Sequence, residues 1–182
     1  MIRSLISAFV FISLVAASQA SPIPPAPNLN VKSYVVMDFD SKMILASSNK
    51  DLTLPPASIT KMMTAYVAFT ELKEKNISLD EEILVSKKAW KTGGSKMFIE
   101  VGKRVKVRDI LQGVITVSGN DASVALAEHI SGDEKTFSTY MNQMATNLGL
   151  TNTNYTNATG LPSDSLYTCL LYTSDAADDS YR

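Results

Sequence analysis

The feature that most limits how this chain can fold is a serine that follows two prolines and opens an apolar helical pattern. Pro55 and Pro56 fix the approach of the chain in the stretch PPASITK, which contains Ser58. Apolar residues then recur at intervals of three and four, the mark of one helix face: Met62, Ala65, Tyr66, Phe69 and Leu72. We therefore predict a helix that starts at about Ser58 and ends near Asn76.

Ser58 and Lys61 form an S-x-x-K motif at the start of this helix. A spacing of three places both side chains on one helix face, within hydrogen-bond reach. A serine hydroxyl is a weak nucleophile, and a lysine can activate it if burial or a neighbouring cation lowers the pKa of the amine. The unpaired N–H groups of the first helical turn can also face a developing oxyanion. Taken alone, the same tetrapeptide more often describes a capping serine followed by a surface lysine.

A second motif, Ser118-Gly119-Asn120, follows a strongly apolar segment that we predict to be a helix over residues 107–117. Its serine can relay a proton, and its amide can hold a substrate carbonyl. The plain alternative is helix capping, in which Asn120 or Asp121 is the cap residue. The apolar segment would bury the motif beside Ser58, so the two motifs together indicate an acyl-transfer site that needs no histidine.

The remaining pattern predicts a mixed fold. We expect a β-hairpin, two short strands and two further helices, the second of them capped by Asp133 and ended by Gly149. Their ranges are 33–37 and 43–46 for the hairpin, 82–85 and 104–107 for the strands, and 121–130 and 134–148 for the helices. Strands and helices do not alternate as they do in a doubly wound sheet, so the predicted class is α/β of the α+β kind.

Both ends of the chain differ from this domain. Residues 1–20 carry Arg3, an apolar run shorter than the ~20 residues of a membrane span, and small residues before a cleavage point, as a secretory signal peptide does. A membrane anchor is the alternative. Residues 21–30 form an extended, proline-rich lead-in. Residues 169–179 (CLLYTSDAADD) resemble a translated sequencing adapter, so we expect residues 169–182 to be a non-native tail; a native disordered terminus is the alternative. The domain is then 31–168.

Charge and rare residues exclude several function classes. Leaving out both ends removes two of 17 basic and three of 18 acidic residues, so 15 of each remain and no basic surface for nucleic acid is expected. The only cysteine, Cys169, lies in the tail, and neither a phosphate-binding glycine loop nor an H-E-x-x-H motif is present. We therefore expect no metal and no cofactor. His129, the only histidine, lies on a helix and is not expected to act in a triad.

The two motifs resemble the signature of penicillin-binding proteins and serine β-lactamases. The wider chain, from about Val31 to about Tyr167, resembles one branch, the low-molecular-mass penicillin-binding proteins, which are D-alanyl-D-alanine carboxypeptidases of the S11 peptidase family. The matching stretches are SYVVMD (33–38), PPASITKMMT (55–64), GSKMFIEVG (94–102), GVITVSGND (113–121) and NATGLP (157–162). The resemblance implies the penicillin-binding transpeptidase fold, an antiparallel sheet with a helical block.

The same resemblance implies roles for four residues. Ser58 is the nucleophile that forms the acyl-enzyme, Lys61 is its base, Ser118 shuttles the proton, and Asn120 contacts both substrate and lysine. The implied substrate is a peptidoglycan stem peptide ending in D-Ala-D-Ala, with β-lactam antibiotics as inhibitors. The implied location is the periplasm or the outer face of the cytoplasmic membrane, where the enzyme would act in cell-wall biosynthesis and remodelling.

A third motif of the family, K-T-G, stands out of place. Lys91-Thr92-Gly93 spells it, but before the S-x-N motif and in a predicted loop, whereas the family carries it later on an edge strand. We therefore expect the true K-T-G strand, and any C-terminal segment that touches the membrane, to lie outside these 182 residues, and this chain alone to be inactive. A β-lactamase is the other interpretation; S-G-N in place of S-D-N and the lack of E-x-x-L-N speak against it.

Overall fold

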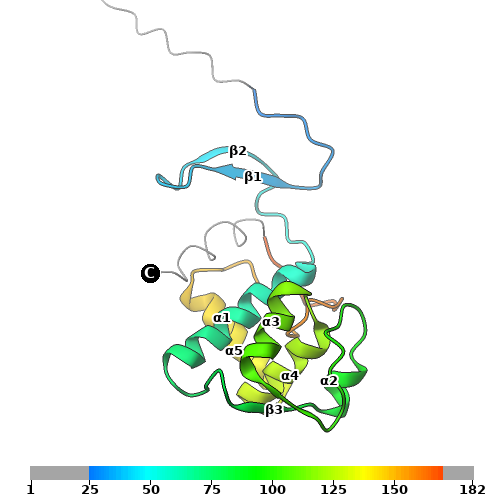
Figure 1. The fold of residues 1–182 in the computed structure, drawn as a ribbon. Coiled ribbons are helices and arrows are strands. Elements are labelled where there is room, and N and C mark those ends of the chain that lie inside the picture. Colours follow the sequence, from blue (N-terminus) through cyan, green and yellow to red (C-terminus); the bar gives the residue numbers. More distant parts are fainter. Residues whose placement is uncertain (1–24, 170–182) are drawn as a thin grey trace, which may run out of the picture.

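The computed structural model describes residues 25–169, which form a helical block with two small antiparallel sheets (Figure 1). The predicted signal peptide, and the predicted tail apart from Cys169, lie outside the described residues. The strands are β1 (Tyr34–Met37), β2 (Ile44–Ser48), β3 (Glu82–Leu84) and β4 (Arg104–Lys106). The helices are η1 (Ala57–Ile59, a 3-10 turn), α1 (Thr60–Lys73), α2 (Lys87–Lys91), α3 (Val107–Thr116), α4 (Asn120–Ser131) and α5 (Glu134–Asn147).

Strands β1 and β2 form the predicted hairpin, which projects from the helical block (Figure 1). Tyr34 pairs with Ser48, and the register shifts by one residue before Met37. Asp38 closes the turn, because its carboxylate accepts hydrogen bonds from the N–H and the hydroxyl of Ser41 at 2.9 and 2.6 Å. The hairpin prediction is confirmed, with β2 running to Ser48.

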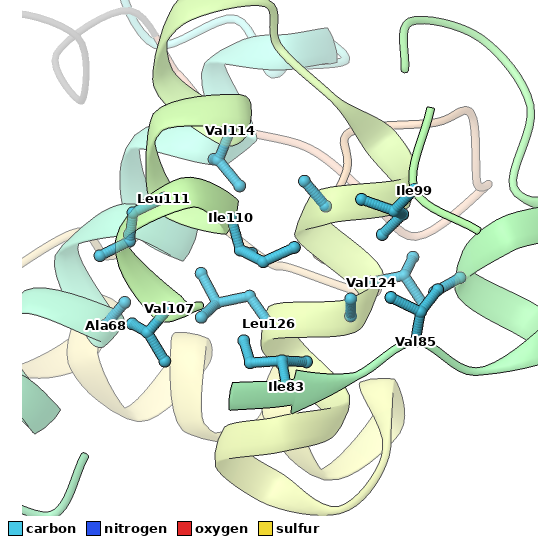
Figure 2. Packing of buried hydrophobic residues seen from close by; sticks show 13 residues of the cluster. Ala68, Ile83, Val85, Ile99, Val107, Ile110, Leu111, Val114, Val124 and Leu126 are labelled. Atoms are coloured by element: carbon cyan, nitrogen blue, oxygen red, sulfur yellow. The ribbon is translucent and has the colours of Figure 1, made fainter. Parts of the chain in front are cut away.

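Helix α4 is the centre of the block, since it packs against α1, α2, α3, α5 and β3. Every residue from 120 to 127 is buried, and most of them are small, which allows close approach of the neighbouring helices. Figure 2 shows Leu126 of α4 beside Ile110 of α3 and Ile83 of β3, and Val124 of α4 beside Val85 and Ile99. This core fixes the junction between α3 and α4, which carries the S-x-N motif.

A second apolar cluster joins α1 to α5. Met63 and Val67 of α1 pack with Phe137 and Met141 of α5, and Tyr155 closes the cluster from the segment after α5. The N-terminus of α5 is capped as predicted, because the Asp133 carboxylate accepts from the Thr136 N–H at 2.8 Å. The cluster therefore holds the segment after α5 against α1.

The predicted short strands pair with each other, with Ile83 opposite Val105. The segment between them contains a helix that the sequence pattern did not predict, α2, which begins where the Ser86 hydroxyl accepts from the Ala89 N–H at 2.9 Å. The expectation of a loop over residues 91–93 is therefore wrong for Lys91, which ends α2, whereas Thr92 is the C-cap and Gly93 lies outside the helix. Five residues are too few to show an apolar period. Between residues 25 and 169, no helix has both the length and the apolar character that crossing a bilayer requires.

Candidate active site

Ser58 lies in the 3-10 turn η1, two residues before α1 begins at Thr60. The predicted helix start is therefore corrected: the chain first makes a tight turn, closed by a hydrogen bond from the Ile59 N–H to the Pro56 carbonyl at 3.1 Å. Ala57 adopts φ of 48°, a conformation that costs free energy in a residue with a Cβ atom. This turn leaves Ser58 exposed at the head of the helix.

Lys61 is in hydrogen-bond contact with Ser58. Its Nζ lies 3.5 Å from the Ser58 Oγ and donates a hydrogen bond to the Thr159 carbonyl at 2.7 Å. The residue is only 5% exposed, and burial lowers the pKa of its amine below the usual value of a lysine. In its neutral form, the amine can donate one N–H to Thr159 and direct its lone pair at the serine hydroxyl.

The segment 157–161, named here the Thr159 loop, holds the carbonyl that Lys61 contacts. The Asn157 Oδ1 accepts from the N–H and hydroxyl of Thr159 and from the Gly160 N–H, at 2.7–3.1 Å. Gly160 has φ of 82°, and a Cβ there would collide with the backbone carbonyl of Ala57. The loop therefore packs against the turn that carries Ser58, and sequence reasoning had found it only as part of a family resemblance.

Ser118 lies between α3 and α4, both of which pack against α1. Its φ of 55° is strained for a residue other than glycine, and the Gly119 N–H donates to the Gly113 carbonyl at 3.0 Å. Among the described residues, the Ser118 Oγ is buried and has no hydrogen-bond partner. A buried hydroxyl without a partner is costly, and within residues 25–169 no hydrogen bond joins this one to Ser58 or Lys61.

Asn120 is the first residue of α4 and is buried. Its Nδ2 donates to the Gly93 carbonyl and its backbone N–H donates to the Ser95 carbonyl, each at 2.7 Å. No hydrogen bond joins Asn120 to Lys61 in residues 25–169, so the lysine contact predicted for Asn120 is not formed in this structure. The misplaced K-T-G does neighbour the S-x-N motif, through the backbone of Gly93 rather than through Lys91 or Thr92.

Asp121 has a larger structural role than the sequence suggested. Its carboxylate accepts from three successive backbone N–H groups, those of Met97, Phe98 and Ile99, at 3.0, 2.9 and 3.3 Å. Phe98 has φ of 64°, which places these N–H groups around one carboxylate. Asp121 is therefore not the N-cap of α4, a position that Gly119 occupies without a side-chain bond. It fixes the loop over residues 95–99 against the start of α4.

His129 lies at the other end of α4, and its Nε2 is 2.6 Å from the Glu81 Oε1. This pair ties α4 to the start of β3 and leaves Ser58 without an imidazole in hydrogen-bond contact. Within residues 25–169, no three histidine, cysteine or acidic side chains lie close enough together to hold a metal ion.

Comparisons with known proteins agree with the geometry. The sequence profile of the D-alanyl-D-alanine carboxypeptidase family, peptidase S11, matches residues 18–178. The chain is 41% identical to D-alanyl-D-alanine carboxypeptidase DacC of Escherichia coli over 161 residues, which cover 85% of this chain and 40% of the relative. It is 43% identical to D-alanyl-D-alanine carboxypeptidase DacA of Haemophilus influenzae over 144 residues, which cover 78% of this chain and 37% of the relative.

Solved structures of members of this family have a similar fold. Penicillin-binding protein 5 of Haemophilus influenzae superposes with a TM-score of 0.78 at 40% identity, over 86% of this chain and 46% of that one. DacD of Francisella tularensis superposes with a TM-score of 0.77 at 37% identity, over 94% of this chain and 44% of that one. The chain thus spans about two fifths of the length of the curated relatives it matches.

Proposed function

The chain belongs to the D-alanyl-D-alanine carboxypeptidase family, and we propose that it supplies the nucleophile side of a serine D-Ala-D-Ala carboxypeptidase. Its fold is that of the penicillin-binding proteins. The observation that carries the proposal is the buried Lys61 amine, held at 2.7 Å by the Thr159 carbonyl and placed 3.5 Å from the Ser58 hydroxyl. A lysine in this position is a general base for a serine nucleophile.

In the proposed acylation step, the Ser58 Oγ attacks the carbonyl carbon of the penultimate D-alanine. The hydroxyl proton passes to the neutral Lys61 Nζ, and the carbonyl oxygen becomes an oxyanion. When the tetrahedral intermediate collapses, the C–N bond to the terminal D-alanine breaks. The leaving amine takes the proton from Lys61 by way of Ser118, which restores the neutral lysine and leaves an ester on Ser58.

In the second step, a water molecule attacks the ester carbonyl and gives its proton to the same base. The bond between the acyl group and the Ser58 Oγ then breaks, and the serine recovers its hydroxyl proton. Asn120 is proposed to hold the substrate amide through its side-chain carbonyl, because its Nδ2 already donates to Gly93. No metal or cofactor takes part in this scheme.

The proposed substrate is the peptidoglycan stem peptide that ends in D-Ala-D-Ala, so the full-length protein would act in cell-wall synthesis and remodelling. One of the solved relatives is named penicillin-binding protein 5, which supports the proposal that β-lactams acylate Ser58 here as well. Such a substrate requires export of the enzyme to the periplasm or to the outer face of the cytoplasmic membrane. Contact with the membrane through a C-terminal segment is part of the same proposal.

These 182 residues contain two of the three motifs that form a site of this family, S-x-x-K and S-x-N. A K-T-G motif on a sheet strand, absent after residue 121 of this sequence, would form the third. We therefore propose that the 182-residue chain by itself does not react with penicillin and that the full-length protein does. Labelling of the 182-residue chain would refute this part of the proposal without touching the role of Ser58.

Labelling with a fluorescent penicillin tests the function. The full-length protein should form a covalent adduct that survives denaturing electrophoresis, and the Ser58→Ala variant should form none. Ser33→Ala is the matched control, since Ser33 is a half-buried serine whose hydroxyl donates to backbone carbonyls of β2 and the adjoining turn. A Ser58→Ala variant that labels as well as the wild type would overturn the assignment. Release of D-alanine from a synthetic pentapeptide tests the substrate.

A further inference from the structure

The carboxylate of Glu134 joins three segments that are far apart in the sequence. Glu134 is the first residue of α5, and its Oε1 accepts from the Ala158 N–H of the Thr159 loop at 3.1 Å. Its Oε2 pairs with the Lys88 Nζ of α2 at 2.7 Å. The Glu134 side chain is 14% exposed and that of Lys88 is 56% exposed, so the carboxylate is largely buried while its lysine partner lies at the surface.

The hydrogen bonds of the Thr159 loop show why this contact matters. The loop binds the N–H groups of Thr159, Gly160 and Leu161 through its own side chains, Asn157 and Thr159. The N–H of Ala158 is instead held by Glu134, and the Ala158 carbonyl accepts from the Thr64 hydroxyl at 2.8 Å. Glu134 of α5 and Thr64 of α1 therefore both bind the peptide groups of Ala158. This residue immediately precedes Thr159, whose carbonyl binds Lys61.

We propose that Glu134 is a positioning residue for Lys61. By holding Ala158, it sets the place of the Thr159 carbonyl and thereby the direction of the lysine amine toward Ser58. The inference rests on the proposed function, because it assigns a role in delivering the base of that reaction. Glu134 acts on the lysine only through the loop, so its effect must pass through the peptide units next to Ala158.

The test uses the full-length protein and the rate constant of acylation by a fluorescent penicillin, measured from about pH 5 to about pH 10. Glu134→Ala should lower this rate constant by about tenfold or more, since a small misplacement of a catalytic group costs up to roughly a hundredfold. A loosened loop also admits water to Lys61, which weakens the desolvation that lowers the pKa of its amine. The midpoint of the rate profile should therefore move to higher pH. Glu134→Gln keeps an oxygen acceptor for Ala158 and should stay near the wild type.

Asp133→Ala is the matched control. Asp133 precedes Glu134 and caps α5 through Thr136, so its loss lowers the melting temperature while the rate constant and its pH profile stay unchanged. If Glu134→Ala does not fold, Glu134→Met removes the acceptor and keeps a side chain of similar length. A Glu134 variant without an acceptor that keeps the wild-type rate and profile overturns the inference, and so does an equal loss in Asp133→Ala. Failure of the proposed function is a separate result, namely labelling of Ser58→Ala.

Discussion

Single residues set the chemistry of this site, and Lys61 is the residue on which it depends. An amine acts as a base only when it is neutral, and burial lowers the Lys61 pKa, so the neutral form is populated at lower pH than in an exposed lysine. We predict that the acylation rate constant of the full-length protein rises with pH and levels off below the ordinary lysine pKa of about 10.4.

The matched variant for this prediction is Lys61→Arg, which stays charged at every accessible pH. It should acylate more slowly by about 10²–10⁴-fold, the usual contribution of a general base. The measurement is the rate of penicillin labelling across the same pH series. A rate that does not change over that series, or an arginine variant as fast as the wild type, would show that Lys61 is not the base.

Gly160 makes a second prediction at this scale, because its Cβ-free backbone lies against Ala57. Gly160→Ala should destabilise the full-length protein by more than the roughly 1–2 kcal/mol that a left-handed alanine costs, and should also slow acylation. Gly149→Ala is the control, since Gly149 has φ of 75° and a Cβ there would meet no atom within 4 Å among the described residues. Urea denaturation and penicillin labelling measure the two effects; equal losses in both variants would contradict the prediction.

At the scale of elements, Asp121 holds the loop over residues 95–99 against the start of α4. An asparagine there would keep only one acceptor oxygen and would turn an NH₂ group toward backbone N–H donors. Asp121→Asn should therefore cost about 1.5–3 kcal/mol, the range for hydrogen bonds to a charged group. Asp109→Asn, in the exposed first turn of α3, should change stability little. Thermal unfolding of both variants measures the two losses of stability. Equal unfolding midpoints in Asp121→Asn and Asp109→Asn would contradict the role given to Asp121.

The sequence predicted those elements that a local period defines. The hairpin, the strands around residues 83 and 105, and the helices now seen as α1, α3, α4 and α5 all have apolar spacings or caps that act within a few residues. Helix α2 was missed because it has five residues and one serine cap. The start of α1 was placed two residues early because a 3-10 turn and an α-helix share the same local pattern.

The candidate site was predictable to the same extent. The Ser58–Lys61 contact follows from a spacing of three, so it could be expected from the motif. The Lys61–Thr159 hydrogen bond joins residues 98 positions apart, and nothing in a single sequence specifies that pairing. The same holds for Asp121, whose partners lie 22–24 residues earlier in the chain. Long-range hydrogen bonds to the backbone carry no residue pattern that could reveal them.

At the scale of the whole molecule, α1 has an apolar face on each side. Met63 and Val67 face the helical block and are buried, whereas Met62 is 41% exposed and Phe69 is 50% exposed. An apolar stripe on a helix is normally covered by another part of the protein. The relatives are more than twice as long as the part this chain matches. We therefore expect the rest of the full-length protein to cover the outer face of α1.

A single substitution tests this expectation in the full-length protein. If Phe69 is covered there, Phe69→Ala should lower the free energy of unfolding by about 3 kcal/mol, as core phenylalanine truncations do. Phe137→Ala, which removes a fully buried ring of α5, sets the reference for such a loss. A surface substitution changes stability by less than about 0.5 kcal/mol. Urea denaturation of the two variants therefore separates the possibilities: a Phe69→Ala loss within that small range would mean that this face of α1 stays open to solvent in the full-length protein.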